Sequence, residues 1–334
     1  MSEEDKGQSG RKRTNMRRRG KSSLRKSLEI HGVYLLFRLW IIGVNFLPLQ
    51  SLGSHGSKIG IIAFYLLGRA RRIALNNLHL ALGREKSEEK IKQICRDSFK
   101  NIGKDMIETC RCLKYEGGYL KTLVRLEGKE YLDQALKQGR GVIAFTAHLG
   151  NFPLMSVRLV NEGYPLSIVA RESKNPKIVK FMTSLRDTIG MESIPAKPRM
   201  TCVARCFKAL KENRILLMQI DLNAPINEAW VDFFGYLVPT FKGPVVFSFR
   251  TGTPIIPMFI VRNAHQHHKI TIHPPFDLNS TEDRHQDITS NVARLTKMIE
   301  AKIREHPEQW WWVLRRFKRA RDIKTGESLF PKRP

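Results

Sequence analysis

Residues 142–153 read Val142-Ile-Ala-Phe-Thr-Ala147-His148-Leu-Gly150-Asn151-Phe-Pro153, and they carry the most information about the architecture. The apolar run 142–147 is followed by a Gly-Asn turn, which predicts a buried strand that ends at the turn. Open α/β sheets bind their ligands at the carboxyl ends of the strands. His148 stands at such an end, so it is the first candidate for a residue that holds a functional proton.

Helical and extended patterns alternate along the chain on both sides of this strand. Apolar spacing predicts helices in Ile59–Leu82 and from Ser87 to Leu113. Further strands are expected at Tyr119–Leu126, Leu166–Ala170, Ile215–Ile220, Trp230–Phe234, Ile255–Val261 and Lys269–Ile272. Helices are expected at Lys129–Lys137, Phe152–Glu162, Asn175–Ile189, Met200–Glu212, Pro244–Thr251 and Asp287–His306. This alternation predicts an α/β sheet covered by helices rather than a repeat protein.

The composition is strongly basic. The 334 residues carry a formal net charge of +27, which suits an anionic membrane, a nucleic acid or an acidic protein as partner. Known nucleic-acid-binding patterns are not found, and neither is the Gly-x-Ser-x-Gly turn of serine hydrolases. The five cysteines lack zinc-site spacing and are expected to be reduced, so they give only a weak metal signal.

The N-terminal region divides into three parts. Residues 1–27 contain a polybasic tail that we expect to be disordered. Residues 28–56 comprise an apolar segment, Leu28–Leu47, and a Gly/Ser/Pro-containing break at Leu49–Ser57. Because the segment is short for a span and is interrupted by Arg38 and Asn45, we predict an interfacial helix or a marginal single span beside the basic tail. A buried core helix is the alternative, and residues 57–334 would form the catalytic domain.

His148 could act as a general base or could be a buried structural histidine, and the residues alone favour neither. Gly150 and Asn151 add weight to a functional site, because the N–H groups of a helix that starts there could bind an oxyanion or a phosphate. Pro153 cannot orient an imidazole, so Asp221, at the end of the strand Ile215–Ile220, is the best acidic partner. The alternative for Asp221 is a turn cap.

Other polar and aromatic residues give weaker signals. Arg171 follows the strand Leu166–Ala170 and could bind a phosphate or carboxylate, or could pair with Glu172 at the surface. Phe234, Gly235 and Thr240 combine an aromatic step, a turn and a hydroxyl before a helix, although core packing explains the phenylalanines equally well. The indoles and cations in residues 307–318 suit a membrane–water boundary or stacking on bases.

Several blocks together resemble the bacterial lipid A biosynthesis (lauroyl/myristoyl) acyltransferase family of the lysophospholipid acyltransferase superfamily. The blocks are Arg69-Ala-Arg-Arg72 with Asn77-Leu78, Gly128-Lys-Glu-Tyr-Leu, Gly139-Arg-Gly-Val-Ile, His148-Leu-Gly-Asn-Phe, Asp221-Leu-Asn-Ala, Val231-Asp-Phe-Phe-Gly with Thr240, Arg250-Thr-Gly-Thr-Pro-Ile-Ile-Pro257, and Pro307-Glu-Gln-Trp-Trp-Trp with Arg-Arg-Phe-Lys318. The family motif usually reads His-x-Gly-Asn-Trp-Glu, and this chain has Pro153 in place of the acid.

The resemblance implies a mixed, mostly parallel sheet of the glycerol-phosphate-acyltransferase kind, at the cytoplasmic face of the inner membrane. It implies transfer of an acyl chain from acyl carrier protein or acyl-CoA to a hydroxyl of a lipid A precursor, with anionic lipid as a partner. It also implies that no metal and no cofactor are required. His148 would be the base and Asp221 its acid, and Gly150, Asn151 and Arg171 would line the thioester, oxyanion or phosphate site. The departure at Pro153 leaves two alternatives: a different lysolipid, glycolipid or aminolipid acceptor, or an inactive membrane-tethered scaffold.

Overall fold

The computed structural model describes residues 29–111, 117–171 and 173–330. The expected basic tail lies outside them. A seven-stranded sheet with the order β1-β9-β8-β2-β5-β3-β4 forms the centre of the molecule. All of its pairings are parallel except the antiparallel pair of β8 with β9. The strands are β1 (Val124–Glu127), β2 (Val142–Thr146), β3 (Leu166–Ala170), β4 (Glu192–Pro195), β5 (Ile215–Gln219), β8 (Ile255–Arg262) and β9 (His268–Ile272).

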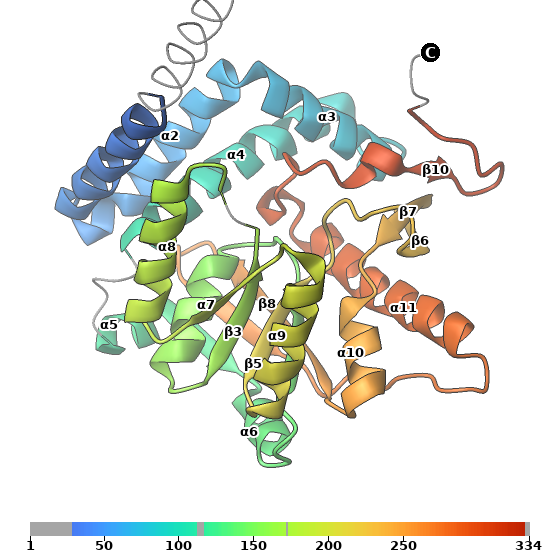
Figure 1. The fold of residues 1–334 in the computed structure, drawn as a ribbon. Coiled ribbons are helices and arrows are strands. Elements are labelled where there is room, and N and C mark those ends of the chain that lie inside the picture. The colour runs from blue at the N-terminus through green and yellow to red at the C-terminus, as the bar shows by residue number, and fades with distance from the viewer. Residues whose placement is uncertain (1–28, 112–116, 172, 331–334) are drawn as a thin grey trace, which may run out of the picture.

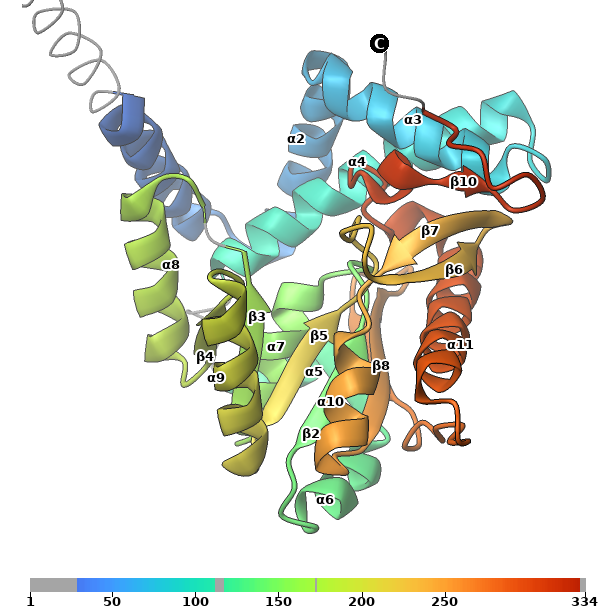
Figure 2. The same ribbon diagram turned by 45° about the vertical axis from the view of Figure 1, so that its right-hand side comes forward.

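Helices cover both faces of this sheet, as Figures 1 and 2 show. Along β2, Val142 and Ala144 pack into one apolar core, and Ile143 and Phe145 pack into the other. This alternation explains the unbroken apolar run, because a strand buried on both faces has no polar side. The covering helices are α5 (Gly117–Leu123), α6 (Lys129–Leu136), α7 (Phe152–Asn161), α8 (Pro176–Thr188), α9 (Arg199–Lys211), α10 (Gly243–Thr251) and α11 (Arg284–Glu305).

A second layer lies across the carboxyl edge of the central strands. It contains α3 (Gly68–Leu82), α4 (Glu88–Arg111) and a small antiparallel sheet of β6 (Ala229–Phe233), β7 (Tyr236–Thr240) and β10 (Arg321–Asp322) (Figure 2). The short helices η3 (Pro307–Gln309) and η4 (Arg316–Arg319) link it to the end of α11. Polar side chains join the parts: Asn77 donates to the Trp312 carbonyl, Ser98 to that of Trp310 and Asn101 to that of Glu308.

The N-terminal elements differ from expectation in one respect. The helix Glu29–Phe46 is present, but η1 (Leu49–Ser51) and α2 (Leu52–Leu66) follow it directly, so the expected break at Leu49–Ser57 is mostly helical. The reason is tertiary packing, because α2 lies against α4. An ideal Cβ on Gly60 would stand 2.2 Å from the Phe99 carbonyl oxygen, so glycine permits the close approach.

Other boundaries also differ. The segment expected as the strand Tyr119–Leu126 is α5 followed by the shorter β1, and α2 and α3 are separate helices with a break at Leu67. Three strands were not expected: β4, at the sheet edge, β7, which closes a hairpin with β6, and the two-residue β10, which pairs with β7. The other elements that have an expected range agree with it to within three residues at either end. A mixed, mostly parallel α/β sheet covered by helices is therefore confirmed.

Candidate active site

His148 and Asp221 form the centre of the candidate site. Each follows its strand by two residues, His148 after β2 and Asp221 after the neighbouring parallel strand β5, and they lie against each other despite 73 positions of separation. The His148 Nδ1 and the Asp221 Oδ1 are 2.8 Å apart, and the His148 backbone N–H donates to Asp221 Oδ2 at 2.7 Å. Parallel pairing in register brings the two strand ends to one edge of the sheet, as the sequence predicted.

The Asp221 carboxylate is fully buried and accepts a third hydrogen bond from Trp310 Nε1 at 2.8 Å. Burial by itself would raise the pKa of Asp221, but the charge of His148 and the hydrogen bonds from His148 and Trp310 outweigh it and hold the pKa below its usual value. The aspartate is therefore ionised, and it fixes the imidazole with a proton on Nδ1.

The other ring nitrogen of His148 is positioned for chemistry. Nε2 makes no hydrogen bond to any residue in the described parts of the chain, and 13% of the side chain is exposed. Phe152 packs on the imidazole with a centroid distance of 4.8 Å, and Trp311 packs on Phe152 at 5.3 Å. An imidazole held at Nδ1 by a carboxylate and open at Nε2 is the arrangement of a general base.

Backbone contacts hold the turn after His148 from the side of η3. The Trp311 N–H donates to the His148 carbonyl, and the Gly150 N–H donates to the Gln309 carbonyl. Gly150 has φ +56°, and an ideal Cβ there would lie 2.3 Å from the Ile260 carbonyl oxygen. Glycine is therefore required for close packing on β8.

Asn151 caps α7 and is fully buried. Its Oδ1 accepts from the Leu154 N–H, and its Nδ2 donates to Glu108 Oε2 at 2.9 Å. The Phe152 N–H is bonded to the Gly150 carbonyl, and Pro153 has no N–H. Contrary to expectation, these N–H groups of the first turn are not free for an oxyanion, because the chain itself uses them.

Three of the expected binding residues lie on the β6–β7 hairpin. Gly235 is exposed in its turn, whereas Phe234 and Thr240 are buried. The Thr240 hydroxyl bonds to the guanidinium of Arg316, which is itself fully buried and also donates to the Leu222 carbonyl beside Asp221. The hairpin is thus tied to the Asp221 loop through Arg316.

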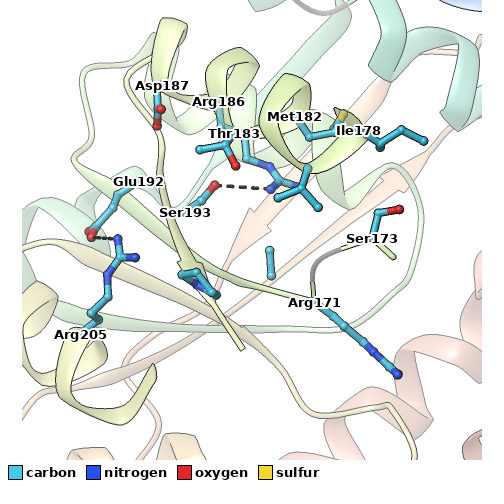
Figure 3. Close-up of a pocket in the computed structure, with 13 residues that line it drawn as sticks. Arg171, Ser173, Ile178, Met182, Thr183, Arg186, Asp187, Glu192, Ser193 and Arg205 are labelled. Carbon is cyan, nitrogen blue, oxygen red and sulfur yellow. Dashed lines mark hydrogen bonds and ion pairs between the residues drawn. The ribbon is translucent and has the colours of Figure 1, made fainter. Parts of the chain in front are cut away.

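Arg171 lies at the carboxyl end of β3 and lines a separate pocket of about 400 Å³ between α8 and the edge strands (Figure 3). Arg186 and Arg205 at the other side of this pocket are bonded to Ser193 and Glu192. The Arg171 side chain is exposed and extends away from these pairs in Figure 3. Its expected partner Glu172 lies outside the described residues.

The sequence analysis missed several residues around the site. Trp310 and Trp312 are fully buried, so the expectation that this indole block faces a membrane boundary is wrong for both. Glu108 and Arg262 were not singled out, and Gln309 and Arg316 were quoted only as parts of the block 307–318. The hydrogen bonds of Glu108 to Asn151, of Arg262 to Gln309 and of Arg316 to Leu222 join residues 43, 47 and 94 positions apart, and no spacing in the sequence encodes them. In the described parts of the chain, no group of three or more His, Cys, Asp or Glu side chains could hold a metal ion.

The chain is similar to several known proteins. Residues 18–319 match the family model of bacterial lipid A biosynthesis acyltransferases. The lipid A biosynthesis palmitoleoyltransferase of Escherichia coli (strain K12) is 26% identical over 275 residues, which cover 81% of this chain and 86% of that one. The phosphatidylinositol mannoside acyltransferase of Mycolicibacterium smegmatis is 24% identical over 185 residues, 54% of this chain and 58% of that one. Among solved structures, the 1-acyl-sn-glycerophosphate acyltransferase PlsC of Thermotoga maritima covers 75% of this chain and 97% of its own, with 13% identity and a TM-score of 0.35.

Proposed function

Because the chain belongs to the bacterial lipid A biosynthesis acyltransferase family and is an acyltransferase, we propose that His148 is its general base and Asp221 the acid that orients it. The observation that carries the proposal is the contact of His148 with the buried Asp221, which leaves Nε2 partly exposed and without a hydrogen bond to any described residue. In the proposed reaction, Nε2 takes the proton of an acceptor hydroxyl, and the hydroxyl oxygen attacks the carbonyl carbon of an acyl thioester. The C–S bond then breaks, and the leaving thiolate takes the proton back from Nε2.

The acyl donor is proposed to be a thioester on acyl carrier protein or CoA, and the acceptor a lipid A precursor or a related glycolipid. The names of the relatives support a saccharide lipid as acceptor, since one is a lipid A acyltransferase and another acts on a phosphatidylinositol mannoside. The net charge of +27 suits an acidic carrier and anionic lipid. We propose that the exposed residues Arg171 and Gly235 line the substrate site. The buried residues Phe234 and Thr240 would not touch the substrate but would hold the β6–β7 hairpin in place.

The structure supports membrane association through apolar side chains at its N-terminal end. No single helix in the described residues is long and apolar enough to cross a bilayer, although Glu29–Phe46 and Leu49–Leu66, which meet at a bend of 114°, have sufficient length and apolar composition together. Leu36 and Phe46 on the first helix and Leu66 on the second are among the most exposed large apolar residues. We propose that this pair lies in the cytoplasmic leaflet of the inner membrane.

Mass spectrometry of the lipids from cells with and without the gene would test the proposed function. We expect one lipid class to lose an acyl chain in the deletion strain, and a plasmid copy to restore it. His148→Ala should fail to restore the chain although the protein accumulates, because a general base contributes about 10²–10⁴ in rate. Full restoration by His148→Ala would remove His148 from the reaction. Unchanged lipids in the deletion strain would favour the inactive scaffold. The scaffold is the second candidate because this chain has Pro153 where the family motif has an acid.

A further inference from the structure

A buried ionic cluster lies behind the turn that carries His148. Asp105 and Glu108 from α4, Arg262 from the end of β8 and His268 from the start of β9 are each at least nine-tenths buried. Arg262 bonds to both Glu108 carboxylate oxygens and donates to Asp105 Oδ1 at 2.5 Å. Charges are costly to bury even in pairs, so a cluster of this kind is a weak source of stability and calls for another explanation.

The two acids of the cluster are not equivalent. Glu108 accepts hydrogen bonds from Arg262, His268 Nε2 and Asn151 Nδ2. Asp105 accepts from Arg262 at Oδ1, and the Trp311 indole N–H faces the same carboxylate, but among the described residues no donor lies within 3.5 Å of Oδ2. Burial raises the pKa of Asp105 to about 7. Burial would also raise that of Glu108, but bonds from His268 and the charge of Arg262 lower it to about 2. Glu108 is therefore the fixed anion.

Two series of hydrogen bonds connect Glu108 to the turn that carries His148. In the first, Glu108 holds the Asn151 amide, whose Oδ1 accepts from the Leu154 N–H and the Thr109 hydroxyl. In the second, Glu108 holds Arg262, whose backbone N–H and carbonyl are both bonded to the Gln309 side chain. The Gln309 carbonyl in turn accepts from the Gly150 N–H.

We propose that Glu108 is a positioning residue for His148, acting through Asn151 on one side of the turn and through Arg262 and Gln309 on the other. The inference rests on the proposed function, in which His148 is the base. Glu108 does not touch the reacting atoms. It fixes the two segments that flank His148, so that Nε2 stays within reach of the acceptor hydroxyl.

Steady-state kinetics of the purified full-length protein would test this role, with an acyl thioester as donor and the acceptor found by lipid analysis. Glu108→Gln should lower kcat by about 10–100-fold with KM changed less than twofold, since small displacements of a catalytic group cost up to about 10² in rate. Glu162→Gln is the matched control. Glu162 also pairs with a buried arginine, Arg158, but at the far end of α7. It should keep wild-type kcat.

Two further variants separate positioning from a loss of folding. Thr109→Val leaves every charge in place and removes one hydrogen bond to Asn151, so it should lower kcat several-fold without lowering the melting temperature by more than a few degrees. Combining Glu108→Gln with Asn151→Asp reverses the donor and acceptor of the 2.9 Å contact and should recover part of kcat. Wild-type kcat in Thr109→Val, or no recovery in the double variant, would overturn the positioning role. If His148→Ala is active, the proposed function fails instead, independently of Glu108.

Discussion

At the scale of single residues, the site depends on how buried carboxylates are satisfied. Asp221 has three hydrogen-bond donors around it, and two of them come from His148. The third is Trp310, and no other acid is in contact with the imidazole among the described residues. The family motif that the sequence resembles has an acid at the position of Pro153, which is the second residue of α7 here. The orienting function that we propose therefore falls to Asp221.

We predict that Asp221→Asn lowers turnover by about 10²–10⁴-fold, because the amide cannot fix the imidazole tautomer or stabilise the imidazolium. The measurement is kcat, with the folded fraction checked by circular dichroism. Asp287→Asn is a suitable control, since Asp287 is also buried and bonded, to Thr281, but on α11. Pro153→Glu added to Asp221→Asn should recover some activity. Asp221 would be a turn cap alone if its variant kept the wild-type rate or failed to fold.

A second residue-scale prediction concerns the pH dependence of stability. Burial raises the pKa of Asp105 in the folded protein to about 7, from its ordinary value of 3.8, so folding disfavours its ionised form. The wild type should therefore lose stability as the pH rises from about 4 to 7. Asp105→Asn has no carboxyl group to ionise, so it does not lose stability in this way. The melting temperature of the variant minus that of the wild type should therefore increase from pH 4 to pH 8. A difference that does not vary with pH would show that Asp105 ionises freely.

At the scale of elements, the contact of α2 with α4 determines where the ionic cluster stands. Three glycines make the approach possible: Gly56 and Gly60 on α2 face Gly103 on α4, with ideal Cβ positions 2.2–2.5 Å from opposing backbone atoms. Asp105 and Glu108 lie on the turn of α4 that follows Gly103. The packing of α2 thus sets the position of the acids that lie behind the turn of His148.

We predict that Gly60→Ala destabilises the protein by roughly 1–3 kcal/mol, because the new methyl group would force two backbones apart. Thermal unfolding measures the change. Gly68→Ala, in the first turn of α3, has open space around the added Cβ and should change stability much less. Equal effects of the two substitutions would mean that the helices can separate at little cost.

At the scale of the whole molecule, exposed apolar side chains gather on the bent helix pair. Leu36 and Phe46 are 69% and 84% exposed on the first helix, and Leu66 is 77% exposed at the end of the second. Exposed arginines follow at Arg69 and Arg72 on α3. Apolar residues beside cations suit the surface of an anionic bilayer.

We predict that replacing Leu36, Phe46 and Leu66 by serine weakens binding to vesicles of anionic phospholipid at least several-fold in a flotation assay. The control replaces Met200 and Ile226, which are 80% and 66% exposed elsewhere on the surface, and should bind as the wild type does. Equal binding by both variants would place the membrane contact elsewhere. A chain shortened to begin near Ser57 is a poorer test, because that cut would remove part of α2, which packs on α4.

The sequence by itself determined the alternation of helices and strands, the buried strand before His148 and the convergence of His148 with Asp221. These follow from local periodicity and from the rule that parallel strands end at one edge, and both leave a signal in nearby residues. Tertiary structure alone decided the helix over Leu52–Gly56, the burial of Trp310 and Trp312, and the use of the first-turn N–H groups of α7 by the chain itself. It also decided the buried ionic cluster, in which Glu108 contacts residues 43 to 160 positions away along the chain. Contacts of that range depend on how whole elements pack, and a single sequence carries no local pattern for them.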